Sequence, residues 1–142
     1  MALTACTPPA KGSPLFDLPE DAVEMGVGIH GEPGRKREKL QSADAMVSEL
    51  VSAVVDDLPY SSGDRVALMV NGLGGTPIGE LYLVYGRAHK QLTERCIDIG
   101  RSYVGECCTS LDMAGVSITL VRLEDEISDL LADPAEIPIR VF

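Results

Sequence analysis

The stretch that most restricts the fold is RVALMVN, which starts at Arg65 and is almost continuously apolar. Strands buried on both faces have this composition, because helices cover the sheet that contains them. Segments with strand spacing and segments with helical spacing alternate along the rest of the chain. The sequence therefore predicts an α/β fold: a mixed β-sheet of about four to six strands flanked by helices, in a single domain.

The other elements follow from the spacing of apolar residues. We predict strands over residues 23–30, where apolar and polar side chains alternate, over 65–71, over 96–105 and over 116–123. We predict helices over residues 42–58, from Thr76 and Pro77 as N-cap and first helical residue, and from Glu124 to Asp133. The buried sides of these helices are predicted to be Val47, Leu50, Val51, Val54 and Leu58; then Ile78, Leu81, Tyr82, Tyr85, Ala88 and Leu92; then Ile127, Leu130 and Leu131.

The two ends of the chain differ from the middle. Residues 1–13 contain prolines and a glycine in a polar context, and we predict an extended N-terminal segment there, with the α/β domain over residues 14–142. The last residues, AEIPIRVF, could add an edge strand. Its apolar side chains would then pair with another chain in a homodimer: Ile137, Ile139, Val141 and Phe142.

The composition excludes some partners. A formal net charge of −10 argues against nucleic acid or an anionic membrane as the main partner. The basic residues 35–37 are expected to form a solvated surface. No apolar stretch approaches the length of a membrane span and no signal peptide is evident, so we expect a cytoplasmic protein. The four cysteines form no C-x-x-C pair, and we expect reduced, structural thiols and no metal.

A glycine-rich stretch, GVGIHGEPGRKR over residues 26–37, contains His30. One interpretation is a tight turn with an incidental histidine. In the other interpretation, Gly26 and Gly28 keep the face of the predicted strand beside the ring free of side chains. This leaves open volume for a small molecule, and Glu32 orients the imidazole. A neutral imidazole is a nucleophile near neutral pH. The residue types alone leave both interpretations open.

Two more loops invite functional hypotheses. NGLGGTP, Asn71 to Pro77, lies between a strand and a helix and could hold a phosphate, but it matches no nucleotide-binding motif, and a close turn is the simpler interpretation. TSLDMAG contributes Thr109, Ser110 and Asp112. Asp112 is either a catalytic base or, as we prefer, a local cap that binds its own backbone. His89 lies within a predicted helix and is expected to be structural or at the surface.

Three motifs carry a resemblance to a known family. GVGIHGEPG, VNGLGGTP and TSLDMAG occur in the order and approximate spacing of the substrate-binding subunit of dihydroxyacetone (glycerone) kinase. The chain is similar to the second, C-terminal domain of that subunit from about Leu3 to its end. The resemblance implies that His30 is the covalent substrate anchor, adding through a ring nitrogen to the ketone of dihydroxyacetone to form a hemiaminal. It places substrate contacts at His30 and Gly31.

The resemblance also implies what this chain would need from partners. The family's subunit has an earlier, N-terminal domain whose His and Asp handle the substrate hydroxyls, and no counterpart is found in this sequence. The phosphoryl donor would be ATP or a phosphorylated subunit of the phosphotransferase system, and we expect this chain to bind no cofactor. We therefore expect an enzyme component that captures substrate and is inactive alone. Two rival hypotheses are a non-catalytic carbonyl-binding or regulatory module, and a structural half that makes dimer contacts.

Overall fold

The structure, a computed structural model, describes residues 1–30 and 32–134. Within these residues five strands form two sheets. The larger sheet has the order β4-β3-β5: β3 (Arg65–Gly72) is parallel to β4 (Asp98–Gly105) and antiparallel to β5 (Val116–Arg122). The smaller is an antiparallel pair of β1 (Ala22–Met25) and β2 (Lys36–Lys39). The α/β class and the mixed sheet are confirmed, with the strands divided between two sheets.

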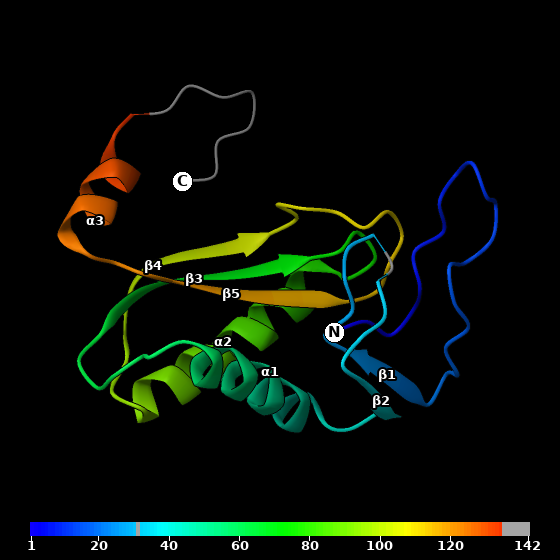
Figure 1. Ribbon diagram of the computed structural model, residues 1–142, viewed down its shortest axis with the longest axis horizontal. Helices are drawn as coiled ribbons and strands as arrows, with labels where there is room; N and C mark the ends of the chain where they lie inside the picture. Colours follow the sequence, from blue (N-terminus) through cyan, green and yellow to red (C-terminus); the bar gives the residue numbers. More distant parts are fainter. Residues whose placement is uncertain (31, 135–142) are drawn as a thin grey trace.

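Two helices cover one face of the larger sheet. Figure 1 shows α1 (Ala43–Asp57) and α2 (Ile78–Glu94) side by side beneath β3, β4 and β5, whereas α3 (Asp125–Ala132) lies beyond the end of β5. Alternate residues of β3 face these helices and are fully buried: Val66, Leu68 and Val70. They pack with Leu81 and Leu92 of α2 in the main core, so β3 is the centre of the fold, as its apolar sequence predicts.

The helix starts follow capping chemistry. Ser42 is the N-cap of α1, and its side chain accepts a hydrogen bond from the amide of Ala45 at 3.3 Å. α2 begins one residue later than predicted, with Pro77 as N-cap. The hydroxyl of Thr76 instead donates to the carbonyl of Gly115 at 2.7 Å and accepts from its amide at 2.9 Å. Thr76 therefore fastens the loop before α2 to the start of β5.

Most residues of β3 are buried as predicted, whereas the predicted buried faces of the helices are partly wrong. Leu58 at the end of α1 is 51% exposed, and in α2 Ile78 and Tyr82 are exposed while Val84 is buried in their place. Helix α3 buries none of its residues, so the predicted burial of Ile127, Leu130 and Leu131 is wrong within the described part of the chain. Helical spacing identifies an apolar face, but a face is buried only where another element packs on it.

The strand predicted over 23–30 is shorter than expected. β1 ends at Met25, and Gly26 turns the chain with a left-handed φ of +73°. His30 therefore lies in a loop and not on a sheet face. β2 was not predicted, because KREK contains no apolar residue; it pairs with β1 in the register Met25↔Lys36. Ion pairs of Arg37 with Glu24 and of Lys36 with Glu49 hold this short strand.

The N-terminal residues join the two sheets. Ala2 forms isolated bridges with Glu24 of β1 and with Gly115 just before β5. Ala2 and Cys6 are buried in a small second core with Leu73 and Met113. The segment predicted over residues 1–13 has no regular strand or helix, yet its first residues are part of the packed structure.

The four cysteines are free thiols, and of these only Cys6 is buried. Across residues 1–30 and 32–134, none of the helices combines the length and apolar composition needed to cross a membrane. The edge strand predicted for residues 135–142 lies outside the described residues, as does Gly31.

Candidate functional site

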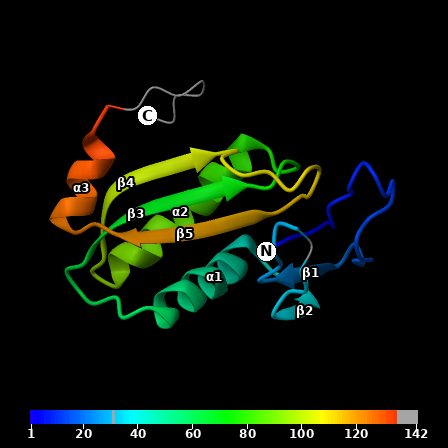
Figure 2. The ribbon, with the colours of Figure 1, turned by 45° about the horizontal axis from the view of Figure 1, so that its top comes forward.

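Three loops meet at one end of the larger sheet. Figure 2 shows that the histidine loop (residues 26–30 and 32–35), the NGLGG loop (residues 71–77) and the Ser110 loop (residues 106–115) gather where β3 and β4 end and β5 begins. β3 and β4 are parallel, so this is the carboxyl edge of the parallel pair. Ligands of open α/β sheets bind outside this edge. The topology thus brings the three motifs of the sequence to one place.

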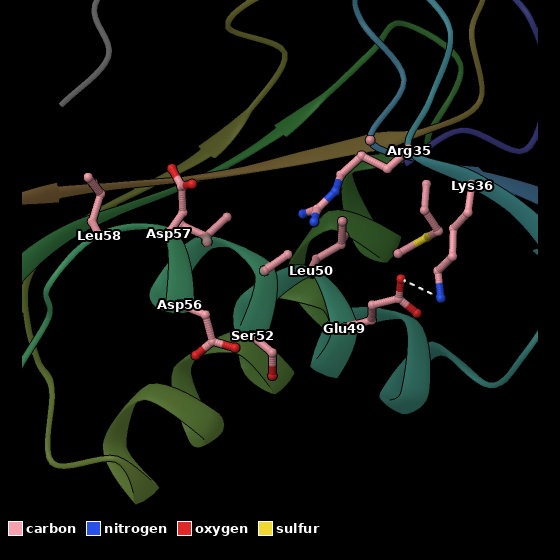
Figure 3. A pocket seen from close by; sticks show the side chains of 12 residues that line it. Arg35, Lys36, Glu49, Leu50, Ser52, Asp56, Asp57 and Leu58 are labelled. Atoms are coloured by element: carbon pink, nitrogen blue, oxygen red, sulfur yellow. Dashed lines mark ion pairs between the residues drawn. The ribbon is translucent and has the colours of Figure 1, made fainter.

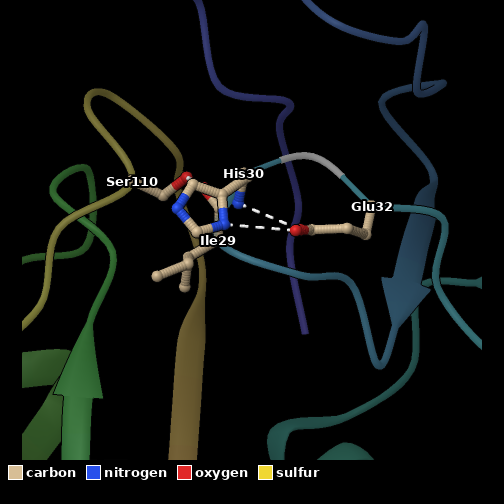
Figure 4. Close-up of polar contacts among 4 residues, drawn as sticks. All are labelled: Ile29, His30, Glu32 and Ser110. Atoms are coloured by element: carbon tan, nitrogen blue, oxygen red, sulfur yellow. Dashed lines mark hydrogen bonds and ion pairs between the residues drawn. The ribbon is translucent and has the colours of Figure 1, made fainter.

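His30 is displayed to solvent within this cluster. Its side chain is 80% exposed, and its ring nitrogen Nδ1 lies 3.1 Å from Glu32 Oε1 (Figure 4). The second carboxylate oxygen, Oε2, accepts a hydrogen bond from the His30 backbone amide at 3.1 Å. Among the described residues, Nδ1 alone of the two ring nitrogens has a hydrogen-bond partner. Glu32 therefore contacts the ring at Nδ1, as expected, and the imidazole as a whole is largely exposed.

The Glu32 carboxyl is held in its ionised form. A hydrogen bond from its own backbone amide, followed by contacts with the His30 amide and ring, lowers the pKa of Glu32 below its ordinary value. A carboxylate beside Nδ1 favours the tautomer that carries its proton on Nδ1. In that tautomer the lone pair is on Nε2. The ring nitrogen without a hydrogen-bond partner among the described residues is therefore the nucleophilic one.

The glycines around the ring have a different purpose from the one expected. A side chain at Gly28 would overlap Glu32 Oε2 and lie 2.7 Å from its Cδ. The space beside Gly28 thus admits the Glu32 carboxylate and is not open volume for a ligand. Gly34 is equally restricted, because a Cβ there would lie 2.5 Å from the carbonyl oxygen of Met25. Glycine here lets the loop fold closely on itself.

A buried carboxylate anchors the base of the histidine loop. Glu24 in β1 is 8% exposed. Its Oε1 accepts from the Gly34 amide at 3.2 Å, and its Oε2 accepts from Arg37 Nε at 2.8 Å. Both ends of the loop are therefore tied to the β1–β2 pair, while His30 lies at its far side.

The NGLGG loop is a closely packed turn. A Cβ at Gly72 would overlap Glu106 Oε1, and one at Gly74, whose φ is +109°, would overlap the carbonyl oxygen of Leu111. The amide of Gly74 donates to Glu106 Oε2 at 3.0 Å, and that of Gly75 donates to the Met113 carbonyl at 3.0 Å. Donors that a phosphate would need are already used, which favours the simpler interpretation of this motif.

The remaining candidates have other hydrogen-bond partners than the ring. Asp112 accepts from the backbone amide of Thr7 at 3.2 Å, so it binds the N-terminal segment and not its own backbone. His89 is exposed on α2, with Thr93 as its neighbour. In residues 1–30 and 32–134, no three His, Cys, Asp or Glu side chains are grouped as metal ligands would be.

Two residues with polar contacts in the site had no assigned role in the sequence. Ser110 donates its hydroxyl to the carbonyl of Ile29, and Asn71 holds the backbone of Cys107 and Cys108. Each contact joins residues far apart in the chain, so no local pattern indicates it.

A separate hollow lies under the β1–β2 pair. It has a volume of about 1060 Å³, and Figure 3 shows Arg35 and Lys36 on one side of it and α1, with Glu49 and Asp57, on the other. Lys36 Nζ forms an ion pair with Glu49 at 2.9 Å across it. His30 is not among its lining residues, so the hollow and the histidine are distinct features.

Similarity to known proteins identifies the family of this chain. The Dak1 domain matches residues 1–139. The chain belongs to the Dak1 domain family. One relative, from Listeria innocua, is named PTS-dependent dihydroxyacetone kinase 2, dihydroxyacetone-binding subunit DhaK. This chain is 41% identical to it over 138 residues, and the match covers 97% of this chain and 42% of the relative. The chain is also 41% identical over 138 residues to the D-erythrulose kinase of Mycolicibacterium smegmatis, covering 97% of this chain and 24% of that one.

Solved structures of Dak1 relatives share the fold. The structure titled dihydroxyacetone kinase operon co-activator Dha-DhaQ superimposes with a TM-score of 0.82 at 34% identity, covering 94% of this chain and 42% of that one. The dihydroxyacetone kinase of C. freundii gives a TM-score of 0.75 at 30% identity, covering 99% and 28%. The chain thus spans less than half the length of these relatives.

Proposed function

We propose that this Dak1 chain is the substrate-capturing part of a dihydroxyacetone kinase, with His30 as the covalent anchor. The observation that carries the proposal is the pairing of His30 with Glu32: Nδ1 is held by a carboxylate, and the His30 side chain is 80% exposed. The names of the relatives, dihydroxyacetone-binding subunits and erythrulose kinases, indicate a small ketone as the substrate class. The second-domain identity implied by the sequence resemblance is part of the same proposal, and Gly31 is proposed as a substrate contact.

The proposed step is an addition to the ketone. The Nε2 lone pair attacks the C2 carbonyl carbon, a carbon–nitrogen bond forms, and the carbonyl π electrons move to the oxygen. The ring becomes cationic, and the Glu32 carboxylate stabilises it through Nδ1. Nδ1 then loses its proton to water, and the alkoxide gains one from water. The product is a neutral hemiaminal with the same atoms as histidine plus ketone.

Covalent capture supplies a selectivity that hydrogen bonds alone supply poorly. Glycerol has the terminal hydroxyls and size of dihydroxyacetone but lacks a carbonyl, so it cannot form the adduct. Erythrulose is a ketone and can. The chain is therefore proposed to accept short ketoses, with dihydroxyacetone first, and to leave a terminal hydroxyl free for phosphoryl transfer.

The complete reaction needs further parts. The proposed partners are the family's N-terminal substrate-binding domain, a phosphoryl donor and, for assembly, a second copy of the chain. The donor is either a phosphorylated subunit, as the name PTS-dependent suggests for the Listeria relative, or ATP, since the C. freundii kinase was solved with AMP-PNP and Mg²⁺. We expect no phosphoryl transfer by this chain alone.

Carbon-13 NMR with dihydroxyacetone labelled at C2 tests the proposal. Capture moves the C2 signal from the carbonyl region to the region of tetrahedral carbon, and native mass spectrometry gains the mass of one dihydroxyacetone. His30→Ala should abolish both signals. His89→Ala is the matched control, because it removes the chain's other histidine from the surface of α2 and should leave both unchanged.

Two results would contradict the proposal. One is the absence of an adduct on a folded wild-type chain at saturating ketone. The other is an adduct that persists in His30→Ala, which would place the reaction elsewhere. Labelled glycerol should give no adduct with any variant, and a signal with glycerol would show that the ketone is not what the site recognises.

A regulatory module is the second candidate function. It is favoured by the likeness in fold to the structure titled as an operon co-activator. Such a module would bind the same ketone without phosphoryl transfer. Mixing this chain with an N-terminal domain and a phosphorylated donor separates the two: dihydroxyacetone phosphate forms if the chain is a kinase component, and does not form if it is a ketone-binding regulator.

A further inference from the structure

The peptide group in front of His30 is held from both sides. Its N–H, which belongs to His30, donates to Glu32 Oε2 at 3.1 Å. Its C=O, which belongs to Ile29, accepts from the Ser110 hydroxyl at 2.5 Å (Figure 4). Because a peptide group is planar, fixing both its donor and its acceptor fixes the plane from which the His30 side chain projects.

Ser110 is itself buried and doubly engaged. It is 3% exposed, although its neighbours in the loop are exposed. Its backbone amide donates to the Leu73 carbonyl at 2.9 Å, while its hydroxyl donates to Ile29. Ser110 thus joins the NGLGG loop, through its main chain, to the histidine loop, through its side chain.

Asn71 fixes the shape of the Ser110 loop. This residue is at the end of β3 and is 3% exposed. Its Oδ1 accepts from the amides of Cys107 and Cys108 at 2.7 Å each, and its Nδ2 donates to the Cys108 carbonyl at 2.9 Å and to Ser117 Oγ at 3.2 Å. All four hydrogen-bonding positions of the amide are occupied. The central strand of the sheet therefore sets the position of the Ser110 loop.

Such support matters because the ring has little packing of its own. His30 lies five residues beyond the end of β1, Ile29 is 39% exposed, and the ring is 80% exposed. A group that must meet a carbonyl carbon along a narrow range of directions has to be held by contacts with rigid elements. The polar contacts through Ser110 and Asn71 supply a connection from β3 to the backbone of His30.

We propose that Ser110 is a positioning residue for His30, placed by Asn71, and that it acts through the Ile29 carbonyl without touching substrate. This inference rests on the proposed function, in which His30 adds to a ketone. It names the hydroxyl of the TSLDMAG motif as part of the capture site, a role distinct from that of the neighbouring Thr109. Thr109 directs its own hydroxyl to the carbonyls of Leu73 and Leu111.

The test compares Ser110→Ala with Thr109→Val, which removes a hydroxyl from the same loop. Two quantities are measured on the folded chain: the equilibrium constant for the adduct with C2-labelled dihydroxyacetone, and the hydrogen-exchange rate of the His30 amide without ligand. Loss of one hydrogen bond should lower the adduct constant about threefold to tenfold in Ser110→Ala and speed exchange by a similar factor. Thr109→Val should change both less than about twofold.

Two further variants separate positioning from folding. Ser110→Thr keeps the hydroxyl and should retain the wild-type adduct constant, and Ser110→Cys, with a weaker donor of similar size, should fall between serine and alanine. A lower Tm in Ser110→Ala with adduct and exchange unchanged would overturn the inference, as would equal losses in Ser110→Ala and Thr109→Val. If the wild type forms no adduct, the proposed function fails by itself, and the exchange rate of the His30 amide still decides whether Ser110 positions this residue.

Discussion

The histidine loop and the NGLGG loop use glycine in the same way. In each, a glycine leaves room for a carboxylate: Gly28 for Glu32, and Gly72 for Glu106. In each, the carboxylate accepts a hydrogen bond from a loop amide, that of His30 in the first and that of Gly74 in the second. Glycine content therefore marks close approach of a side chain in both loops and does not by itself mark a ligand site.

What differs is the polar side chain that each loop carries. The His30 side chain is 80% exposed, whereas Asn71 is 3% exposed and uses its whole amide inside the protein. Leu73 buries the NGLGG loop further in the second core. We propose that the first loop acts on a ligand and that the second supports it.

The largest effect is expected at Gly74. A Cβ there would overlap the Leu111 carbonyl oxygen, which is backbone and cannot swing aside, and φ is +109°. We expect Gly74→Ala to lower the free energy of unfolding by more than about 3 kcal/mol. Gly63→Ala is the control, because Gly63 also has a positive φ, +92°, but nothing within 4 Å; it should cost about 1–2 kcal/mol. Urea unfolding measures both, and equal costs would show that the NGLGG loop is not closely packed.

A pH effect on the free energy of unfolding is expected from the buried N-terminal amine. The Met1 amine donates to the carbonyl of Val116, the first residue of β5, at 2.8 Å. Burial lowers the pKa of this amine to about 6 from 8.0. Between these values the unfolded chain binds more protons than the folded chain. For the 142-residue chain with a free Met1 amine, the free energy of unfolding should therefore rise from about pH 6 to pH 8 and then level off, by up to about 3 kcal/mol.

The control for this effect is the same chain with an acetylated N-terminus, which keeps a donor but cannot titrate. Unfolding curves at several pH values should show the rise only in the chain with a free amine. A rise of equal size in both would assign the pH dependence to other groups.

These contrasts also show how much the sequence can predict. The helices at 43–57 and 78–94 and the strands at 65–72 and 116–122 were predicted to within a few residues, because their apolar spacing is local. β2 was missed, since its stability comes from pairing with β1 and from ion pairs with residues distant in sequence.

The site shows the same limit. His30 and Glu32 were predicted to meet because they lie two positions apart in the chain, and the structure places their side chains 3.1 Å apart. The contact of Ser110 with Ile29 spans 81 positions, and that of Asn71 with Cys108 spans 37. Only the fold brings those residues together, so their place in the site could not be derived from spacing.

A smaller effect on stability, but a clear one on capture, is expected at Gly28. A Cβ there would displace the Glu32 carboxylate, which is the far end of a flexible side chain and can move. Gly28→Ala should therefore cost less than about 1 kcal/mol in unfolding free energy and still lower the adduct constant about threefold to tenfold, because the Nδ1 contact is lost. A large loss of stability without a change in capture would reverse the assignment of the two loops.

The smallest effect is expected from titrating Glu32. Since hydrogen bonds from its own amide and from His30 lower its pKa, the carboxylate should persist as the pH falls below the ordinary range of a glutamate, about 4.3, and protonate only at a lower midpoint. Any contribution of this contact to folding is present above the ordinary pKa and is lost as the pH falls through the lowered one, and it should be too small to detect because the group is exposed. Carbon-13 NMR of the carboxyl group gives the midpoint directly. In Gly28→Ala it should return toward the ordinary value, while in Gly63→Ala it should stay low; an ordinary midpoint in the wild type would mean that the carboxylate does not hold the histidine ring.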